Sequence, residues 1–111
     1  MNITCEEYDD VAVITIDGEF SADTVEVFRN TIEESFQNKR VFFVINFEKV
    51  SLIYSQGLET LLWLVDQCVE RQGHVKLAAL DEASAQILAI TKVDQTFDIH
   101  PQVIEAVKCF S

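Results

Sequence analysis

The chain has 111 residues, of which 49% are hydrophobic and 24% are charged, and it contains only three glycines and one proline. This composition is typical of one globular domain with a sizeable core, and it excludes a disordered or low-complexity chain. The formal net charge is −11, from 19 acidic and 8 basic residues, which argues against binding to nucleic acids or to anionic membranes. We therefore expect a single domain over residues 1–111.

Membrane and redox signals point to the cytoplasm. No apolar stretch approaches the roughly 20 residues that a spanning helix needs, and the first residues lack the basic and apolar regions of a signal peptide. The three cysteines are an odd number without a Cys-x-x-Cys pair, which predicts reduced thiols. We expect a cytoplasmic protein without membrane insertion, in which Cys68 fills the core.

The first half of the chain predicts strands at residues 2–8, 11–16 and 41–47. The second of these is apolar on both faces, which is typical of an internal strand, and Gly18 would form the turn that closes it. Ser21 or Asp23 would cap a helix that ends near Gln37. The third strand has six apolar residues out of seven and is the predicted centre of the sheet, followed by a polar turn.

A long amphipathic helix is predicted from about residue 55 to residue 71, with Leu61 and Leu62 in the core and Gly73 as its C-terminal cap residue. A strand at 75–80, a weaker helix at 82–93 and a last strand at 96–99 follow. Ile87 and Ile90 are expected to be buried in the weaker helix. Pro101 would open a final helix, because a missing N–H costs nothing at that position. Three side chains would dock this helix: Val103, Val107 and Phe110.

Alternation of strands and helices favours right-handed crossovers and a mostly parallel sheet. An antiparallel hairpin at the start would make the sheet mixed. The predicted fold class is α/β, with a mixed, mostly parallel sheet of four to five strands and about four helices.

Ser55 lies where the central strand and the long helix meet. As the residue just before a helix it could simply cap free backbone N–H groups, which is a structural role. Alternatively, a helix N-terminus favours an anion, so a phosphate on Ser55 would be stabilised there. Gly57 has no Cβ and would leave the first turn open to another protein chain. The residues by themselves leave both interpretations open.

Residues 50–58, after the apolar run 43–47, resemble the signature of the STAS domain family, whose best-known members are bacterial anti-sigma factor antagonists. The family pattern is an apolar strand followed by Asp-Ser-Ser/Thr-Gly-Leu at the start of a helix. Residues 14–20 are similar to the family's second-strand motif, and residues 73–77 to the Gly-led strand after its long helix. The resemblance covers nearly the whole chain.

The resemblance implies a STAS fold and a partner switch. The unphosphorylated domain would bind an anti-sigma factor with serine-kinase activity, the kinase would phosphorylate Ser55, and a PP2C-type phosphatase would remove the phosphate. No cofactor is implied. The implied partner-binding residues are Ser21, Asp23, Tyr54, Ser55, Gln56, Gly57 and Leu58.

The sequence departs from the family pattern beside the acceptor serine. Tyr54 replaces the usual Asp, Gln56 replaces the second Ser/Thr, and Ser21 stands where the family often has Asp. Tyr54 is either a specificity residue at a divergent interface or a packing residue. Two other functions stay open: a structural subunit of a larger assembly, such as a lipid-transport ABC complex, or a small-molecule or nucleotide sensor without a phosphorylation cycle.

Catalysis has little support in the sequence. A serine nucleophile needs a base held by a third group, and His74 and His100, the two histidines, are far from Ser55 along the chain. No Gly-x-Ser-x-Gly motif, phosphate-binding loop or metal-ligand spacing is present. We predict a binding protein without catalytic residues or a metal site.

Overall fold

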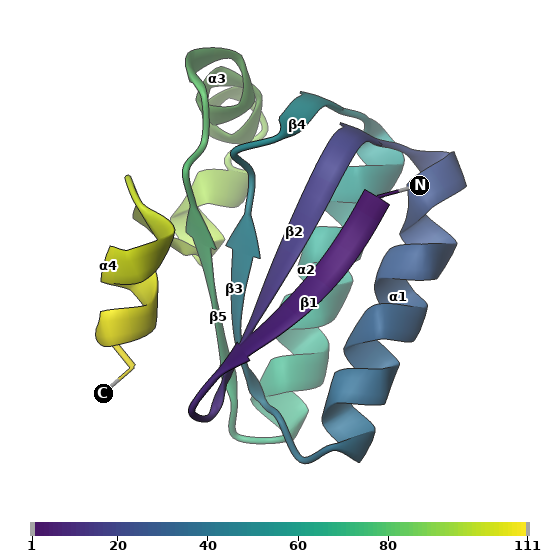
Figure 1. Cartoon of the computed structure of the whole chain (residues 1–111). Helices are drawn as coiled ribbons and strands as arrows, with labels where there is room; N and C mark the ends of the chain where they lie inside the picture. The colour runs from purple at the N-terminus through teal and green to yellow at the C-terminus, as the bar shows by residue number, and fades with distance from the viewer. Residues whose placement is uncertain (1, 111) are drawn as a thin grey trace.

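The computed structural model describes residues 2–110, in which a six-stranded mixed sheet carries helices on both faces (Figure 1). The predicted α/β class is confirmed. In chain order the elements are β1 (Asn2–Tyr8), β2 (Val11–Phe20), α1 (Ala22–Gln37), β3 (Phe42–Asn46), β4 (Val50–Ile53), α2 (Ser55–Glu70), β5 (His74–Ala78), α3 (Glu82–Ile90), the 3₁₀ turn η1 (Val93–Thr96), β6 (Asp98–His100) and α4 (Val103–Lys108).

The strand order is β1-β2-β3-β5-β6. The remaining strand, β4, pairs with the last residues of β2, beyond the part of β2 that pairs with β3. Only β1 runs antiparallel to its neighbour; the other pairings are parallel. The described residues thus contain six strands instead of the predicted four to five. The additional strand is β4, which lies in the segment predicted as a polar turn, because four residues that include Ser51 carry no clear strand pattern.

Gly18 lies inside β2 and does not end it, so the predicted turn is wrong. Its φ of +109° suits glycine, and the pairing register shifts between Gly18 and Glu19, which is a β-bulge. Before the bulge, residues Val11 to Thr15 of β2 pair with β3; after it, Glu19 and Phe20 pair with Leu52 and Ile53. One long strand therefore holds two parallel partners in succession.

Alternate residues of β2 supply two hydrophobic clusters. Ala12, Ile14 and Ile16 belong to the larger cluster, beneath α1 and α2, and Val11 and Val13 to the smaller one, beneath α4. The aromatic rings of the larger cluster pack closely, with 5.1 Å between the centroids of Phe20 and Phe28 and 5.4 Å between those of Phe36 and Phe43. These pairs add specific geometry to the burial of apolar area.

Cys68 is buried, as predicted, and burial raises the pKa of its thiol to about 12. The three cysteines form no disulfide. Among the described residues, no helix is long and apolar enough to cross a bilayer.

The second half of the chain corrects several predicted boundaries. The predicted helix 82–93 ends at Ile90, whose side chain is 80% exposed instead of buried, and a left-handed Lys92 leads into η1. The last strand is shifted to Asp98–His100, and α4 begins at Val103 after the N-cap residue Gln102, two residues beyond Pro101. The predicted docking of α4 is confirmed: its contacts with the smaller cluster are made by Val103, Val107 and Phe110.

Gly73 caps the end of α2 through its N–H, which donates a hydrogen bond of 2.7 Å to the carbonyl of Cys68, but it is not the residue in the left-handed conformation. Gln72 takes that conformation, with a φ of +60°, after the helix has ended. Gly73 is instead required because a Cβ at this position would collide with the carbonyl group of Val41.

A charged cluster joins β5 to β6. Lys76 is only 8% exposed, and its Nζ lies 3.1 Å from Oδ2 of Asp98, while Nε2 of His74 lies 2.9 Å from the same oxygen. The hydrogen bond with His74 and then the contacts with Lys76 lower the pKa of Asp98. The ammonium group of Lys76 is therefore neutralised by a carboxylate that stays ionised.

We expect Asp98→Asn to lower the free energy of unfolding at pH 7 by about 1 kcal/mol, because the ammonium of Lys76 loses its charged acceptor while solvent screening keeps the cost small. The pKa of Asp98 is lower in the folded state than in the unfolded state. Its stabilising contribution is therefore present above the unfolded pKa and is lost as the pH falls through the folded one. Urea unfolding from pH 7 down to pH 2 measures both effects.

Asp66→Asn is the control, because it removes one exposed carboxylate from α2. An equal loss in this control, or a difference between wild type and Asp98→Asn that persists to pH 2, would contradict the assignment.

Candidate partner-binding surface

The candidate surface lies at the carboxyl ends of β2 and β4, where α1 and α2 begin (Figure 1). Phe20, the last residue of β2, is paired with Ile53, and its carbonyl accepts a hydrogen bond of 3.0 Å from the N–H of Tyr54. Ser21 and Tyr54 each follow this pair directly. Strand pairing thus brings together two segments more than 30 residues apart in sequence.

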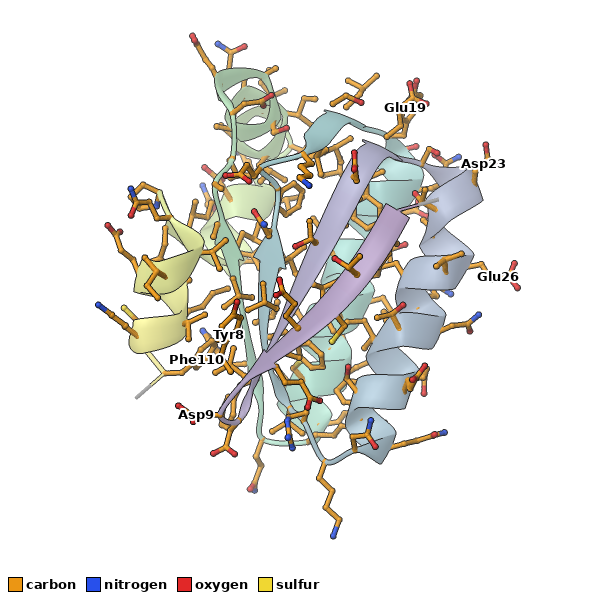
Figure 2. All side chains as sticks on the ribbon, viewed as in Figure 1. Tyr8, Asp9, Glu19, Asp23, Glu26 and Phe110 are labelled. Carbon is orange, nitrogen blue, oxygen red and sulfur yellow. The ribbon has the colours of Figure 1, made fainter. Side chains whose placement is uncertain are left out.

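Ser21 is the N-cap residue of α1, one of the two positions predicted. Its N–H donates a hydrogen bond of 2.9 Å to Oγ1 of Thr24, which closes the first turn as a capping box. Asp23 is exposed in that turn, and Figure 2 shows its side chain at the same end of the molecule as Glu19. Its carboxylate is well placed to interact with the helix dipole.

Ser55 is the first residue of α2, and the preceding Tyr54 is its N-cap residue, so the predicted capping role of Ser55 is wrong. Its Oγ is exposed and lies 3.4 Å from Oε1 of the neighbouring Gln56. The first hydrogen bond of the helix runs from the N–H of Leu58 to the carbonyl of Tyr54. Tyr54 has no side-chain capping bond, so the N–H groups at the start of α2 are available to an external acceptor.

Gly57 is buried, which contradicts the reason for expecting it to contact a partner. An added Cβ would lie 2.6 Å from the carbonyl oxygen of Phe20 and 2.9 Å from its ring. The missing side chain makes room for another part of the same chain. Gly57 positions α2 against β2 and does not present a surface.

Tyr54 has 41% of its surface exposed, and its hydroxyl lies 3.4 Å from Oε2 of Glu19. Leu58 is half-buried against the larger cluster. Leu62, predicted to be in the core, is 38% exposed. The ring of Tyr54 is therefore the large side chain that this surface presents beside Ser55.

Sequence reasoning missed Glu19 and Leu52, which are opposite each other in the β2–β4 pairing. Leu52 is 39% exposed, next to the buried Ile53. In β4, Val50 and Ile53 are buried, and the two residues between them are exposed. The matching signal in the sequence is the position of these two apolar residues at the ends of the segment. A strand of four residues is too short for this pattern to stand out.

The surface is strongly acidic. Residues 17–26 and 50–60 contain no lysine or arginine, and their five carboxylates belong to Asp17, Glu19, Asp23, Glu26 and Glu59. Such a field attracts a basic partner and resists a second negative charge.

Within the described part of the chain, the hydroxyl of Ser55 has no histidine beside it that could act as a catalytic base. His74 and His100 lie on β5 and β6, and the hydrogen bonds within residues 2–110 connect neither of them to Ser55. The same residues contain no group of three His, Cys, Asp or Glu side chains arranged to hold a metal ion. An exposed serine at a helix start, beside a tyrosine and several carboxylates, is suited to recognition by another macromolecule or to modification by one.

Comparison with known proteins agrees with this geometry. The sequence profile of the STAS domain matches residues 2–106. The fold is similar to that of an anti-sigma factor antagonist from Mycobacterium paratuberculosis, with a TM-score of 0.86 and 22% identity, over 97% of this chain and 92% of that one.

It is also similar to the anti-sigma factor antagonist SpoIIAA in its unphosphorylated form, with a TM-score of 0.87 and 20% identity over 98% and 96% of the two chains. The phosphorylated form of SpoIIAA, described as a Bacillus cell fate determinant, gives a TM-score of 0.79 at 20% identity, over 99% of this chain and all of that one. At these identities the similarity establishes a shared fold.

We expect Gly57→Ala to lower the free energy of unfolding by about 2 kcal/mol, because the new methyl group overlaps the backbone of Phe20. Urea unfolding measures the loss. Gln56→Ala, on the exposed side of the same turn, is the control and should change stability by less than about 0.5 kcal/mol. A Gly57→Ala variant as stable as the control would show that α2 can move away from β2 without cost.

Proposed function

Because the chain belongs to the STAS domain family, we propose that it is an anti-sigma factor antagonist that works by partner switching. In this proposal it is a binding protein without enzymatic activity of its own. Unphosphorylated, it binds an anti-sigma factor that is also a serine kinase, in the cytoplasm. Phosphorylation of Ser55 releases it, and a PP2C-type phosphatase restores binding.

The observation that carries the proposal is the position of Ser55. Its hydroxyl is exposed on the first residue of α2, within the stretch 50–58 that resembles the STAS signature. A kinase can reach the hydroxyl without unfolding the domain. Once attached, the phosphate would lie near uncapped N–H groups and the positive end of the helix dipole, which favour an anion.

Electrostatics explains how one phosphate would end binding. A phosphoserine adds about −1.5 to −2 charges at neutral pH. The surrounding surface already carries the carboxylates of Glu19, Asp23 and Glu59 without a lysine or arginine in the same segments. Added negative charge there opposes association with the nucleotide-bound kinase, because the phosphates of the nucleotide are also negative, while the fold stays the same. The switch is therefore a local change in charge.

Tyr54 is proposed as the specificity residue of this interface. Its side chain is 41% exposed, contacts Glu19 and neighbours the acceptor serine. Tyrosines with this combination of area and a polar end are frequent hot spots in protein interfaces. Ser21, Asp23, Gln56 and Leu58 complete the proposed contact surface, which Gly57 supports from below.

A second candidate is a STAS module that binds constitutively, as a structural subunit or a ligand sensor. The observation that favours it is Tyr54, since the family pattern has an acidic residue beside the phosphorylated serine. The fold is also similar to part of the mouse anion transporter Slc26a9, with a TM-score of 0.77 and 15% identity, over 92% of this chain and 18% of that one. In this case binding would not depend on the state of Ser55.

We expect the purified protein, mixed with the serine-kinase anti-sigma factor of its own genome and ATP, to gain one phosphate on Ser55. Intact mass and peptide mapping would locate it. The complex seen by gel filtration with ADP should dissociate after phosphorylation, whereas Ser55→Ala should gain no phosphate and stay bound in ATP.

Ser51→Ala is the matched control, because Ser51 is also exposed and lies four residues away in β4. It should be phosphorylated and released like the wild type. Phosphate on another serine would contradict the assignment of Ser55. An unphosphorylated protein that stays bound to an active kinase would favour the constitutive module.

We also expect Tyr54→Ala to weaken binding to the anti-sigma factor by tenfold or more, which corresponds to about 1.4 kcal/mol. The melting temperature should change little, because the side chain is 41% exposed and its hydroxyl makes a single long contact, of 3.4 Å, with Glu19. Titration calorimetry measures the affinity. Leu62→Ala, which truncates a side chain of similar exposure about two turns further along α2, is the control, and an equal loss there would argue against a specific role of Tyr54.

A further inference from the structure

A cleft of about 250 Å³ lies at the other end of β2 from Ser55. It is bounded by the turn between β1 and β2, the start of β3 and the end of α4, and Figure 2 shows Tyr8, Asp9 and Phe110 gathered there. Because β2 has ten residues, its two ends are roughly 30 Å apart. The cleft is thus separate from the proposed partner-binding surface.

Three aromatic rings line the cleft: those of Tyr8, Phe42 and Phe110. Phe42 and Phe110 are tilted by 46° with 5.3 Å between their centroids, and Tyr8 is 45% exposed. Rings placed in this way offer their negative faces to a cation. Nζ of Lys76 already lies 5.1 Å from the centroid of Phe110, so this ring accepts a cation within the protein itself.

Two carboxylates complete the lining, those of Asp9 and Asp10 in the turn between β1 and β2. Both residues are exposed, and within residues 2–110 neither takes part in an ion pair. Two of the neighbouring bases already have acidic partners. Arg40 contacts Glu7 at 3.4 Å, and Lys76 is neutralised by Asp98. The cleft therefore combines the exposed ring of Tyr8 and the edge of an aromatic pair with two carboxylates that take part in no ion pair among the described residues.

We propose that this cleft binds an alkylguanidinium group, the group at the end of an arginine side chain. A planar guanidinium can stack on an aromatic ring and donate two hydrogen bonds to a carboxylate at once, whereas an ammonium is a more strongly hydrated point charge. The volume is below the roughly 300 Å³ at which sites for drug-sized ligands begin, so it suits one side chain or a ligand of that size. A protein with a net charge of −11 also concentrates cations around itself.

Binding is testable by NMR titration of the ¹⁵N-labelled full chain with N-acetyl-arginine-N-methylamide. We expect saturable shifts with a millimolar dissociation constant, confined to residues 8–11, 42 and 107–110. The citrulline derivative has the same shape without the charge and should bind at least fivefold more weakly. Free L-arginine is the second probe: tighter binding of the free amino acid would identify a small metabolite as the ligand, and tighter binding of the capped form an arginine within a peptide.

The double variant Asp9→Asn/Asp10→Asn should weaken binding of the capped arginine about fivefold or more. Asparagine tolerates the φ of +55° at position 9, so the turn is preserved, and the dispersion of the amide spectrum verifies the fold. Asp66→Asn/Glu70→Gln removes two exposed charges from α2 and should change the affinity by less than twofold. Equal binding of citrulline, shifts scattered over the acidic surface, or an equal loss in the α2 control would overturn the proposal.

Discussion

The pairing of one strand with two successive partners is the constraint on which this structure depends. β2 pairs with β3 over its first half and with β4 over its end, and the bulge at Gly18 makes the change of partner possible. Without this bulge, Phe20 would not be paired with Ile53, and Tyr54 would have no carbonyl to bind at 3.0 Å. The starts of α1 and α2 would then be positioned independently. A single conformation that glycine adopts readily thus sets the geometry of the candidate surface.

Close approach between backbone segments reinforces this constraint. Gly57 lets the first turn of α2 lie directly on Phe20, and Gly73 lets the chain after α2 pass the carbonyl of Val41. Both ends of α2 are therefore fixed against neighbouring segments by residues without side chains. Cys68 and Leu64, between them, are buried in the larger cluster. Contacts at both ends thus fix the position of Ser55, as the proposed switch requires, since that switch changes a charge and not the fold.

The two ends of β2 are both acidic, but the groups that surround their carboxylates differ. The acidity follows from the overall charge of −11. At the Ser55 end the carboxylates surround an exposed hydroxyl and uncapped helix N–H groups, which suits reversible addition of a phosphate. At the other end the carboxylates border aromatic rings, which suits a cation. The sheet holds these two surfaces apart, so that a ligand at one end need not compete with a partner at the other.

The sequence was sufficient to predict the α/β class, the position of the central strand, the docking face of α4 and the burial of Cys68. These features depend on apolar periodicity and composition, which are local properties of the chain. Only the tertiary structure decided that Gly18 forms a bulge, that residues 50–53 are a strand, that Gly57 is buried and that Leu62 and Ile90 are exposed. Each of these features depends on which other segment of the chain packs against the residue in question. The local sequence around a glycine or a four-residue strand does not show which segment that is. The candidate serine was recognisable from its motif, whereas the contacts of the neighbouring Tyr54 with Glu19 and Phe20 arise from strand pairing across more than 30 residues.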